Sequence, residues 1–179
     1  MKKGLFVLFL HICCANHIVA QSKGTDNLSV RSNAYYGFVI PEYSQTRYLV
    51  QNPVNGLDIS FVKKTAGKTL WEHIYKFPEY GLTLSFTTLG NKNVLGNGWA
   101  LHPFVKTFII NRERFQLSPE FGLGVGYVTK KFNLNSNYEN VTLGSHFNVY
   151  FNFKLYARVA LTKKLSFNTG ISFSHFSNA

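Results

Sequence analysis

The chain has 179 residues and a formal net charge of +11, with 45% hydrophobic, 16% aromatic and 15% charged residues. This length allows one domain, or one domain behind a leader. The low charge content and the many aromatics exclude a disordered chain. The lack of any apolar run of about 18 residues excludes a helical protein with several membrane spans. The basic balance admits nucleic acid, anionic lipid or acidic polysaccharide as partners without choosing among them.

The first 20 residues have the features of a secretory signal peptide. Lys2 and Lys3 form a positive start, residues 4–14 are mostly apolar, and the segment ends on the small residue Ala20. The apolar run is too short to cross a hydrocarbon core of about 30 Å as a helix. We therefore expect residues 1–20 to be a signal peptide that directs export, with cleavage just after Ala20.

Both cysteines of the chain, Cys13 and Cys14, lie in this leader. The expected mature chain then has no cysteine, which excludes a disulfide framework, a thiolate zinc site and a cysteine nucleophile. Removal of Lys2 and Lys3 lowers the formal charge from +11 to +9 (11 − 2). An exported chain without a nucleic-acid-binding motif is not expected to bind nucleic acid.

A period of two dominates the rest of the chain and predicts β-strands. In each stretch one face is rich in Phe, Leu and Val, and the other holds glycines, small hydroxyls, amides and a few charges. Seven antiparallel strands are expected, over residues 33–40, 57–61, 80–88, 98–111, 115–129, 143–161 and 165–177. The fourth alternates less cleanly, and Pro103 favours a bulge there.

Alternation alone does not say which face points outward, because a soluble lipocalin-like barrel buries its apolar face and a membrane barrel exposes it. The polar faces mix small residues with charges of both signs, which suits the filled lumen of an eight-stranded barrel. These charges are Arg31, Asp58, Glu120, Lys154 and Arg158. We therefore favour an all-β, antiparallel, eight-stranded outer-membrane barrel over a soluble barrel.

The predicted connections alternate in length, as in an outer-membrane barrel. Longer polar connections span residues 41–54, 90–97 and 130–142, short ones span 111–114 and 162–164, and residues 65–78 break the trend. Bacterial single-chain barrels have an even number of strands, and an open edge in lipid is prohibitive. With seven strands predicted, we expect residues 21–179 to be an incomplete barrel domain whose closing strand is missing. We expect this truncated chain to insert poorly and to be inactive.

The last predicted strand carries a candidate catalytic pair. His175 and Ser177 continue its apolar face, two residues and about 7 Å apart. A serine becomes a nucleophile at neutral pH when a base takes its proton, and imidazole is the usual base. The alternative interpretation is a histidine at the membrane interface beside a polar loop residue. His102 and His146 lack metal-ligand spacing, so no metal or other cofactor is expected.

The last strand also resembles a known family. Residues 175–179 read His-Phe-Ser-Asn-Ala, after the alternating Gly-Ile-Ser-Phe-Ser of residues 170–174. This motif resembles the active-site strand of PagL-type lipid A 3-O-deacylases, the acyloxyacyl hydrolase family of eight-stranded outer-membrane barrels. Residues 77–81 and 95–101 are also similar to versions of that family. The resemblance covers the rest of the mature chain more loosely.

The resemblance implies a serine esterase of the outer membrane that removes the 3-O-linked acyl chain of lipid A in lipopolysaccharide. It implies that Ser177 is the nucleophile, His175 the general base and Asn178 an oxyanion-hole contributor. A glutamate orients the histidine in the family, and it would lie about a dozen residues past Ser177, beyond Ala179. Neither Glu79 nor Glu120 occupies that position.

Basic residues in or beside the predicted long loops are candidates for binding the phosphates of lipid A: Arg47, Lys92, Lys130 and Lys131. The alternative is a solvated basic rim. Two other functions stay open at this stage, a non-enzymatic small barrel of the structural or adhesion type and a soluble binder. The sequence indicates no oligomeric state.

Overall fold

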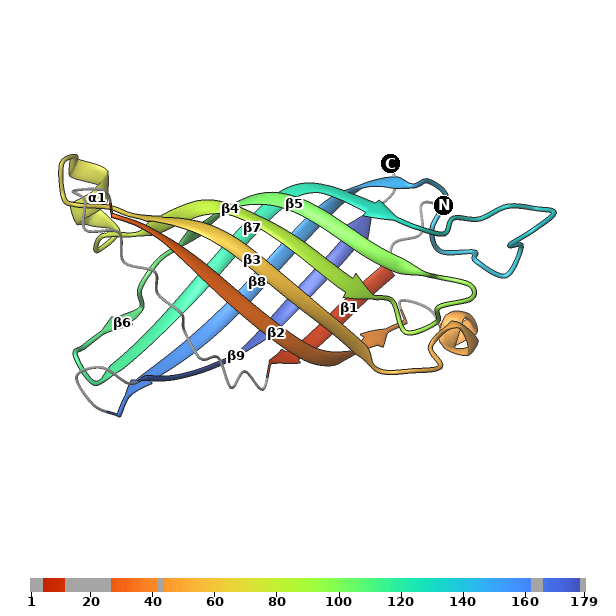
Figure 1. Ribbon diagram of the computed structural model, residues 1–179, viewed down its shortest axis with the longest axis horizontal. Coiled ribbons are helices and arrows are strands. Elements are labelled where there is room, and N and C mark those ends of the chain that lie inside the picture. Colours follow the sequence, from red (N-terminus) through yellow and green to blue (C-terminus); the bar gives the residue numbers. More distant parts are fainter. Residues whose placement is uncertain (1–4, 12–26, 42–43, 162–165, 178–179) are drawn as a thin grey trace.

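A computed structural model shows an all-β protein and describes residues 5–11, 27–41, 44–161 and 166–177 (Figure 1). The elements in chain order are β1 (Leu5–His11), β2 (Leu28–Ile40), the 3-10 helix η1 (Ser44–Leu49), β3 (Val54–Lys64), α1 (Leu70–Ile74), β4 (Glu79–Thr88), β5 (Asn97–Lys106), β6 (Ile110–Asn111), β7 (Phe115–Val128), β8 (Phe147–Ala160) and β9 (Ser166–Ser177). All seven predicted strands are present, as β2, β3, β4, β5, β7, β8 and β9. Within the described residues, no helix is long and apolar enough to cross a membrane.

The strands pair antiparallel and close into a ring. The order around the ring is β1, β2, β3, β4, β5, β7, β8 and β9, with β9 paired back to β1 and the two-residue β6 beside β7. The site end is the end at which β9 finishes, and it carries the connections 41–53, 89–96 and 129–146 (Figure 1). The far end carries the connections 65–78 and 107–114. The all-β antiparallel barrel predicted from alternation is confirmed.

The eighth strand of the ring, β1, comes from the segment that the sequence predicts to be a leader. Leu8 of β1 lies opposite Phe38 of β2, and Val7 lies opposite Ser174 of β9. Unpaired backbone groups in hydrocarbon cost several kcal/mol each, so an apolar strand between β2 and β9 removes two costly edges. Cleavage after Ala20 stays a prediction, because that residue lies outside the described part of the chain. In a chain cleaved there, a different strand would have to pair with β2 and β9.

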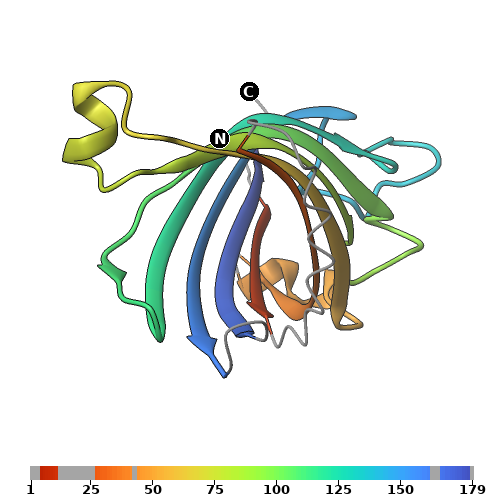
Figure 2. The same ribbon diagram turned by 60° about the vertical axis from the view of Figure 1, so that its left-hand side comes forward.

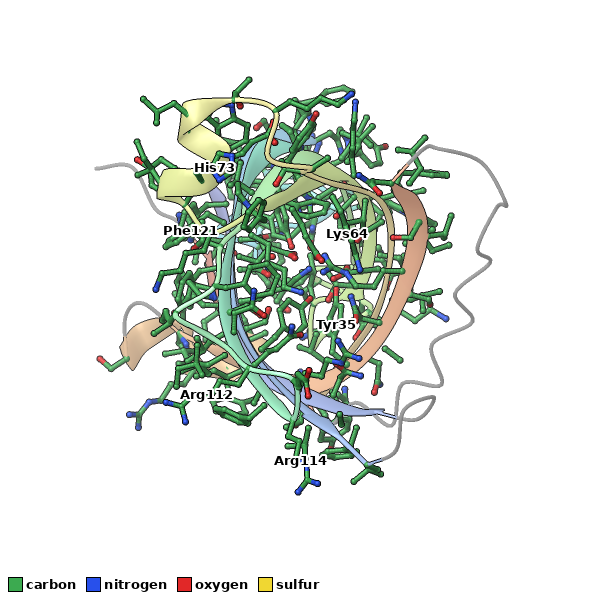
Figure 3. All side chains as sticks on the ribbon, turned by 90° about the vertical axis from the view of Figure 1, so that its left-hand side faces the viewer. Tyr35, Lys64, His73, Arg112, Arg114 and Phe121 are labelled. Carbon is green, nitrogen blue, oxygen red and sulfur yellow. The ribbon has the colours of Figure 1, made fainter. Side chains whose placement is uncertain are left out.

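The wall is apolar outside and polar inside. Exposed side chains on the outer faces include Phe38, Leu57, Phe61, Leu84, Leu101, Leu123, Val149 and Ile171. Side chains buried in the lumen include Asn33, Asp58, Ser60, Thr83, Ser85, Glu120, Asn152, Lys154 and Ser172. Figure 3, an end-on view, shows Tyr35 inside the ring and Phe121 on its outside. This polarity is that of a membrane barrel and the inverse of a lipocalin.

A compact ion network fills the middle of the lumen. The Lys154 ammonium donates to Asp58 (2.7 Å) and to Glu120 (3.4 Å). Glu120 also accepts a hydrogen bond from the Arg31 guanidinium, which lies over the Tyr156 ring. Two cations thus neutralise two carboxylates where water is excluded, which is the condition for burying charge at low cost.

Two expectations about individual residues are wrong. Arg158 is expected inside the lumen but lies exposed at the far-end mouth. There its guanidinium donates a hydrogen bond to the Gln116 side-chain oxygen (3.2 Å). Leu143 belongs to a loop and is fully buried, because β8 begins only at Phe147. Both residues fit the period-two pattern of the predicted strand, so alternation alone could not show that one is exposed and the other belongs to a loop.

The expected bulge at Pro103 is also absent. On either side of it, Leu101 lies opposite Val125 and Phe104 opposite Gly122, so the register between β5 and β7 does not change. Proline has no N–H to donate, so it interrupts the ladder without inserting an extra residue. β7 loses its hydrogen-bond partner there, while the pairing of β5 with β4 continues through Pro103.

The loops of the site end form an apolar plug over the lumen. It consists of Leu49, Leu89, Val94, Leu95 and Leu143, packed on the wall residues Tyr35, Val39, Val54, Ala100, Val128, Tyr150 and Phe176. Hydrogen bonds tie the loops together: Tyr48 donates to the Glu139 carbonyl (2.8 Å), and Asn137 and Asn140 donate to the Val94 carbonyl (3.0 Å each). The barrel is therefore filled in its middle and covered at one mouth, which does not suit a channel.

Removing one partner of the ion network should destabilise the barrel strongly. Lys154→Met leaves Asp58 as an unpaired buried carboxylate, which typically costs 3–5 kcal/mol. The matched control is Lys64→Met, whose side chain is 62% exposed and pairs only loosely with Glu79; it should cost about 0–1 kcal/mol. Urea unfolding followed by the gel mobility of folded and unfolded barrel measures both. Equal losses in the two variants would contradict a stabilising network.

Candidate functional site

The candidate catalytic residues lie at the end of β9 on the outer surface of the barrel. Ser174 and Phe176 are buried in the lumen, whereas His175 and Ser177 are half-buried and point the other way. Successive side chains of a strand point to opposite faces, so the pair shares the face that continues the apolar wall. Sequence alternation predicts this orientation.

The surroundings of the pair on the outer wall are apolar. In β8, Phe151 lies opposite His175 and Val149 lies opposite Ser177. A polar pair in such a wall is costly unless it lies at the interface or serves a function. The arrangement therefore presents a hydroxyl and an imidazole sideways, toward whatever surrounds the barrel, and not toward the lumen.

Phe176, between the two candidates, anchors the end of the strand from the inside. Its ring packs against Tyr150, with centroids 4.9 Å apart, and is only 1% exposed. Gly98 and Gly126 make room for it, since a Cβ at either position would lie 2.7 or 2.6 Å from the ring. The position of His175 and Ser177 therefore depends on the packing of the apolar plug.

Sequence reasoning missed this anchor. The inward face of β9 is otherwise small and polar, with Asn168, Gly170, Ser172 and Ser174 in the same phase. Phe176 is the one large aromatic residue on that inward face, and its presence there could have predicted the anchor. A phenylalanine among small lumen residues indicates a local apolar contact inside the barrel, which here comes from the loops.

Two carboxylates that the sequence left without a catalytic role do not lie with the pair. Glu120 is fully buried in the lumen and engaged by Arg31 and Lys154. Glu79 lies at the far end and pairs with Lys106 (3.3 Å). Within the described parts of β8 and β1, the strands on either side of β9, no carboxylate occurs at the register of the pair.

The remaining candidates are partly described. Asn178 lies outside the described residues. The four basic candidates, Arg47, Lys92, Lys130 and Lys131, are exposed on the three loops of the site end. The barrel thus brings three separated chain segments to the same end as the pair. Among the described residues, no group of three His, Cys, Asp or Glu side chains is arranged to hold a metal ion.

These features define a class of protein. A small closed barrel with a lipid-compatible wall, a filled lumen and a serine–histidine pair in the wall is a membrane barrel with a candidate hydrolytic site facing the lipid.

Comparison with protein families identifies the particular group. The family model described as lipid A 3-O-deacylase (PagL) matches residues 55–179, which is 125 of the 179 residues. The chain belongs to this family, and the resemblance inferred from the last strand is confirmed. Family and fold together support lipid A as the substrate class and the outer membrane as the location. No curated protein and no solved structure gives a significant match.

Truncation of the anchor should destabilise the site end. Phe176→Ala leaves a cavity in the plug and should lower the free energy of unfolding by about 3–5 kcal/mol. Phe167→Ala is the matched control, because Phe167 lies on the same strand but is 43% exposed on the outer wall. Urea unfolding in detergent compares the two. If both variants lose the same stability, Phe176 is not an anchor.

Proposed function

We propose that this protein is an outer-membrane serine esterase that removes the 3-O-linked acyl chain of lipid A. The observation that carries the proposal is the outward position of His175 and Ser177 in an apolar wall at the loop-bearing end. Lipid A holds its ester-linked 3-hydroxyacyl chains just below the sugar backbone in the outer leaflet. A pair at the outer rim of the wall could meet that ester without extracting the lipid.

The proposed reaction follows serine hydrolase chemistry. His175 takes the proton of the Ser177 hydroxyl as its oxygen attacks the ester carbonyl carbon. The tetrahedral intermediate collapses, the sugar hydroxyl leaves with the proton from His175, and an acyl-enzyme remains. Water, deprotonated by His175, then releases the fatty acid and restores Ser177. No metal or cofactor takes part in these steps.

Two further groups belong to the proposal. Asn178 is the proposed donor to the oxyanion, supported by its place directly after the nucleophile in the family motif. A carboxylate is expected to orient His175. Because the outer face of β8 beside the pair is apolar, we expect this carboxylate on the strand that pairs with the other edge of β9 in the active enzyme.

The basic loop residues are proposed to bind the phosphates of lipid A. Arg47, Lys92, Lys130 and Lys131 are exposed at the end where the pair lies. Lysine and arginine near an anionic membrane surface contribute roughly 1 kcal/mol each. The proposed substrate is thus held by its head group above the wall while its acyl ester reaches Ser177.

Mutation of the pair tests the proposed chemistry. The complete open reading frame is expressed in a Gram-negative host, and lipid A is analysed by mass spectrometry for loss of a 3-hydroxyacyl chain. Ser177→Ala and His175→Ala should each abolish the loss, because the nucleophile or its base is gone. Ser32→Ala, an exposed serine on the outer face of β2, should retain it. Unchanged lipid A with a folded wild-type barrel would instead favour the non-enzymatic barrel.

Removal of loop charge tests the phosphate contacts. Lys130→Ala with Lys131→Ala should raise KM about tenfold or more and leave kcat nearly unchanged, since two contacts of roughly 1 kcal/mol each are lost. Arg112→Ala with Arg114→Ala removes the same charge at the far end, where both side chains point away from the barrel (Figure 3). That control should leave KM unchanged. Equal KM values in both double variants would refute phosphate binding by these loops.

A further inference from the structure

The connection between β3 and β4, residues 65–78, has a structure unlike that of a short turn. It contains α1 and projects outward from the far-end rim, away from the lumen (Figures 1 and 2). We call residues 65–78 the foot. A hydrogen bond from the Thr65 hydroxyl to the Pro78 carbonyl (2.9 Å) closes its base.

Two polar side chains of the foot, Glu72 and His73, are used inside it. One oxygen of Glu72 accepts hydrogen bonds from the backbone N–H groups of Gly67 (2.6 Å) and Lys68 (2.8 Å). A nitrogen of the His73 ring is hydrogen-bonded to the Gly67 carbonyl (2.9 Å), and the ring packs edge-on against the Phe77 ring. Burial acts to raise the pKa of the Glu72 carboxyl, but hydrogen bonds from the Lys68 backbone and the Thr69 hydroxyl outweigh it and lower that pKa. The foot is thus held together by an ionised internal cap.

The apolar side chains of the foot are outside. Exposures are 77% for Leu70, 42% for Trp71, 63% for Ile74, 56% for Tyr75 and 46% for Phe77, and α1 has no buried residue. Leu70 with Ile74, and Trp71 with Tyr75, are four apart and so lie on the same side of the helix. Exposing such an apolar cluster to water is unfavourable, so it indicates a surface that contacts a membrane or a protein partner.

The backbone supports this display. Lys76 and Phe77 both have positive φ angles, 57° and 60°. Two successive non-glycine residues in the left-handed region cost free energy, and such strain persists where the surrounding structure imposes it. Here the turn brings Phe77 back against His73 and returns the chain to Pro78, so the foot is a shaped projection.

The chemistry around the foot indicates what covers it. On the adjacent strands, Phe61 (62% exposed), Tyr80 and Leu82 carry the apolar wall up to its base. Lys63 and Lys64 at the end of β3, with Lys68 and Lys76 in the foot, surround the apolar cluster with positive charge. Tryptophan, tyrosine and lysine next to a lipid-facing wall are the groups that favour an anionic membrane interface.

We infer that the foot is an interfacial anchor that binds the head-group region of an anionic phospholipid leaflet, on the membrane face opposite His175 and Ser177. The ring of Trp71 and the side chains of Leu70 and Ile74 enter the boundary between head groups and acyl chains, and Lys68 and Lys76 lie at the phosphates. The foot extends the contact area of the wall and fixes the depth of the barrel in the membrane. This inference rests on the membrane barrel and not on the esterase.

The depth of Trp71 tests the anchor directly. The chain has two tryptophans, Trp71 and Trp99, so Trp99→Phe leaves Trp71 as the only one. The full chain is reconstituted into phosphatidylethanolamine–phosphatidylglycerol vesicles that carry bromines at defined acyl depths. Shallow bromines should reduce the Trp71 emission about twofold or more, and deep bromines should reduce it less. Both leaflets hold the same lipids, so the direction of insertion does not matter.

A matched variant supplies the control. Trp71→Phe leaves Trp99, which is 44% exposed on the outer wall and should be quenched in any correctly inserted barrel. The inference is overturned if Trp99 is quenched while Trp71 is insensitive to bromines, open to iodide and red-shifted in emission. A foot that contacts a protein partner instead of lipid would give that result.

Charge reversal tests the preference for anionic lipid. Lys68→Glu with Lys76→Glu should abolish the stronger quenching of Trp71 by brominated phosphatidylglycerol over brominated phosphatidylcholine. Lys130→Glu with Lys131→Glu, at the site end, should retain it. An unchanged preference in the foot variant would overturn the role of these lysines. Ser177→Ala should leave Trp71 quenching unchanged, so failure of the anchor and failure of the esterase are distinguishable.

Discussion

Every backbone N–H and C=O that crosses hydrocarbon must be paired within the protein, and the barrel is organised around that requirement. It explains why eight strands close into a ring, and why an apolar segment lies between β2 and β9, whose edges would otherwise be open. Closure then turns one face of every strand to lipid and the other into a lumen too narrow for bulk water. The apolar wall and the neutralised charges of Arg31, Asp58, Glu120 and Lys154 both follow from it.

The lumen connects the wall to the loops. Its middle is held by ion pairs and its site end by the apolar plug, and Phe176 belongs to both the plug and the candidate active-site strand. Packing inside the barrel therefore sets the position of side chains on its outside. Phe176 is buried between the two candidates, so this internal anchor helps to hold His175 and Ser177 in place.

A pair on the outer wall reverses the usual geometry of a hydrolase. The proposed enzyme needs no deep pocket, because the membrane itself presents the substrate ester to the wall. What the protein must then control is depth, since an ester a few ångströms above or below Ser177 is out of reach. The plug and basic loops at one end, and the foot at the other, are the features suited to controlling depth.

The sequence by itself determined the strands, their two faces and the phase that directs His175 and Ser177 outward, because side-chain direction in a strand alternates with a period of two. The short motif at residues 175–179 was enough to suggest the family. Only the tertiary structure decided which partners meet: Lys154 with Asp58, 96 residues apart, Phe176 with Gly98 and Gly126, and Leu143 with the other loops. Those contacts depend on ring closure and loop packing, which bring together distant segments that no local periodicity relates. The foot lies between these cases. Its aromatic residues were visible in the sequence, but the outward display became clear only once Glu72 and His73 were seen to be used inside it.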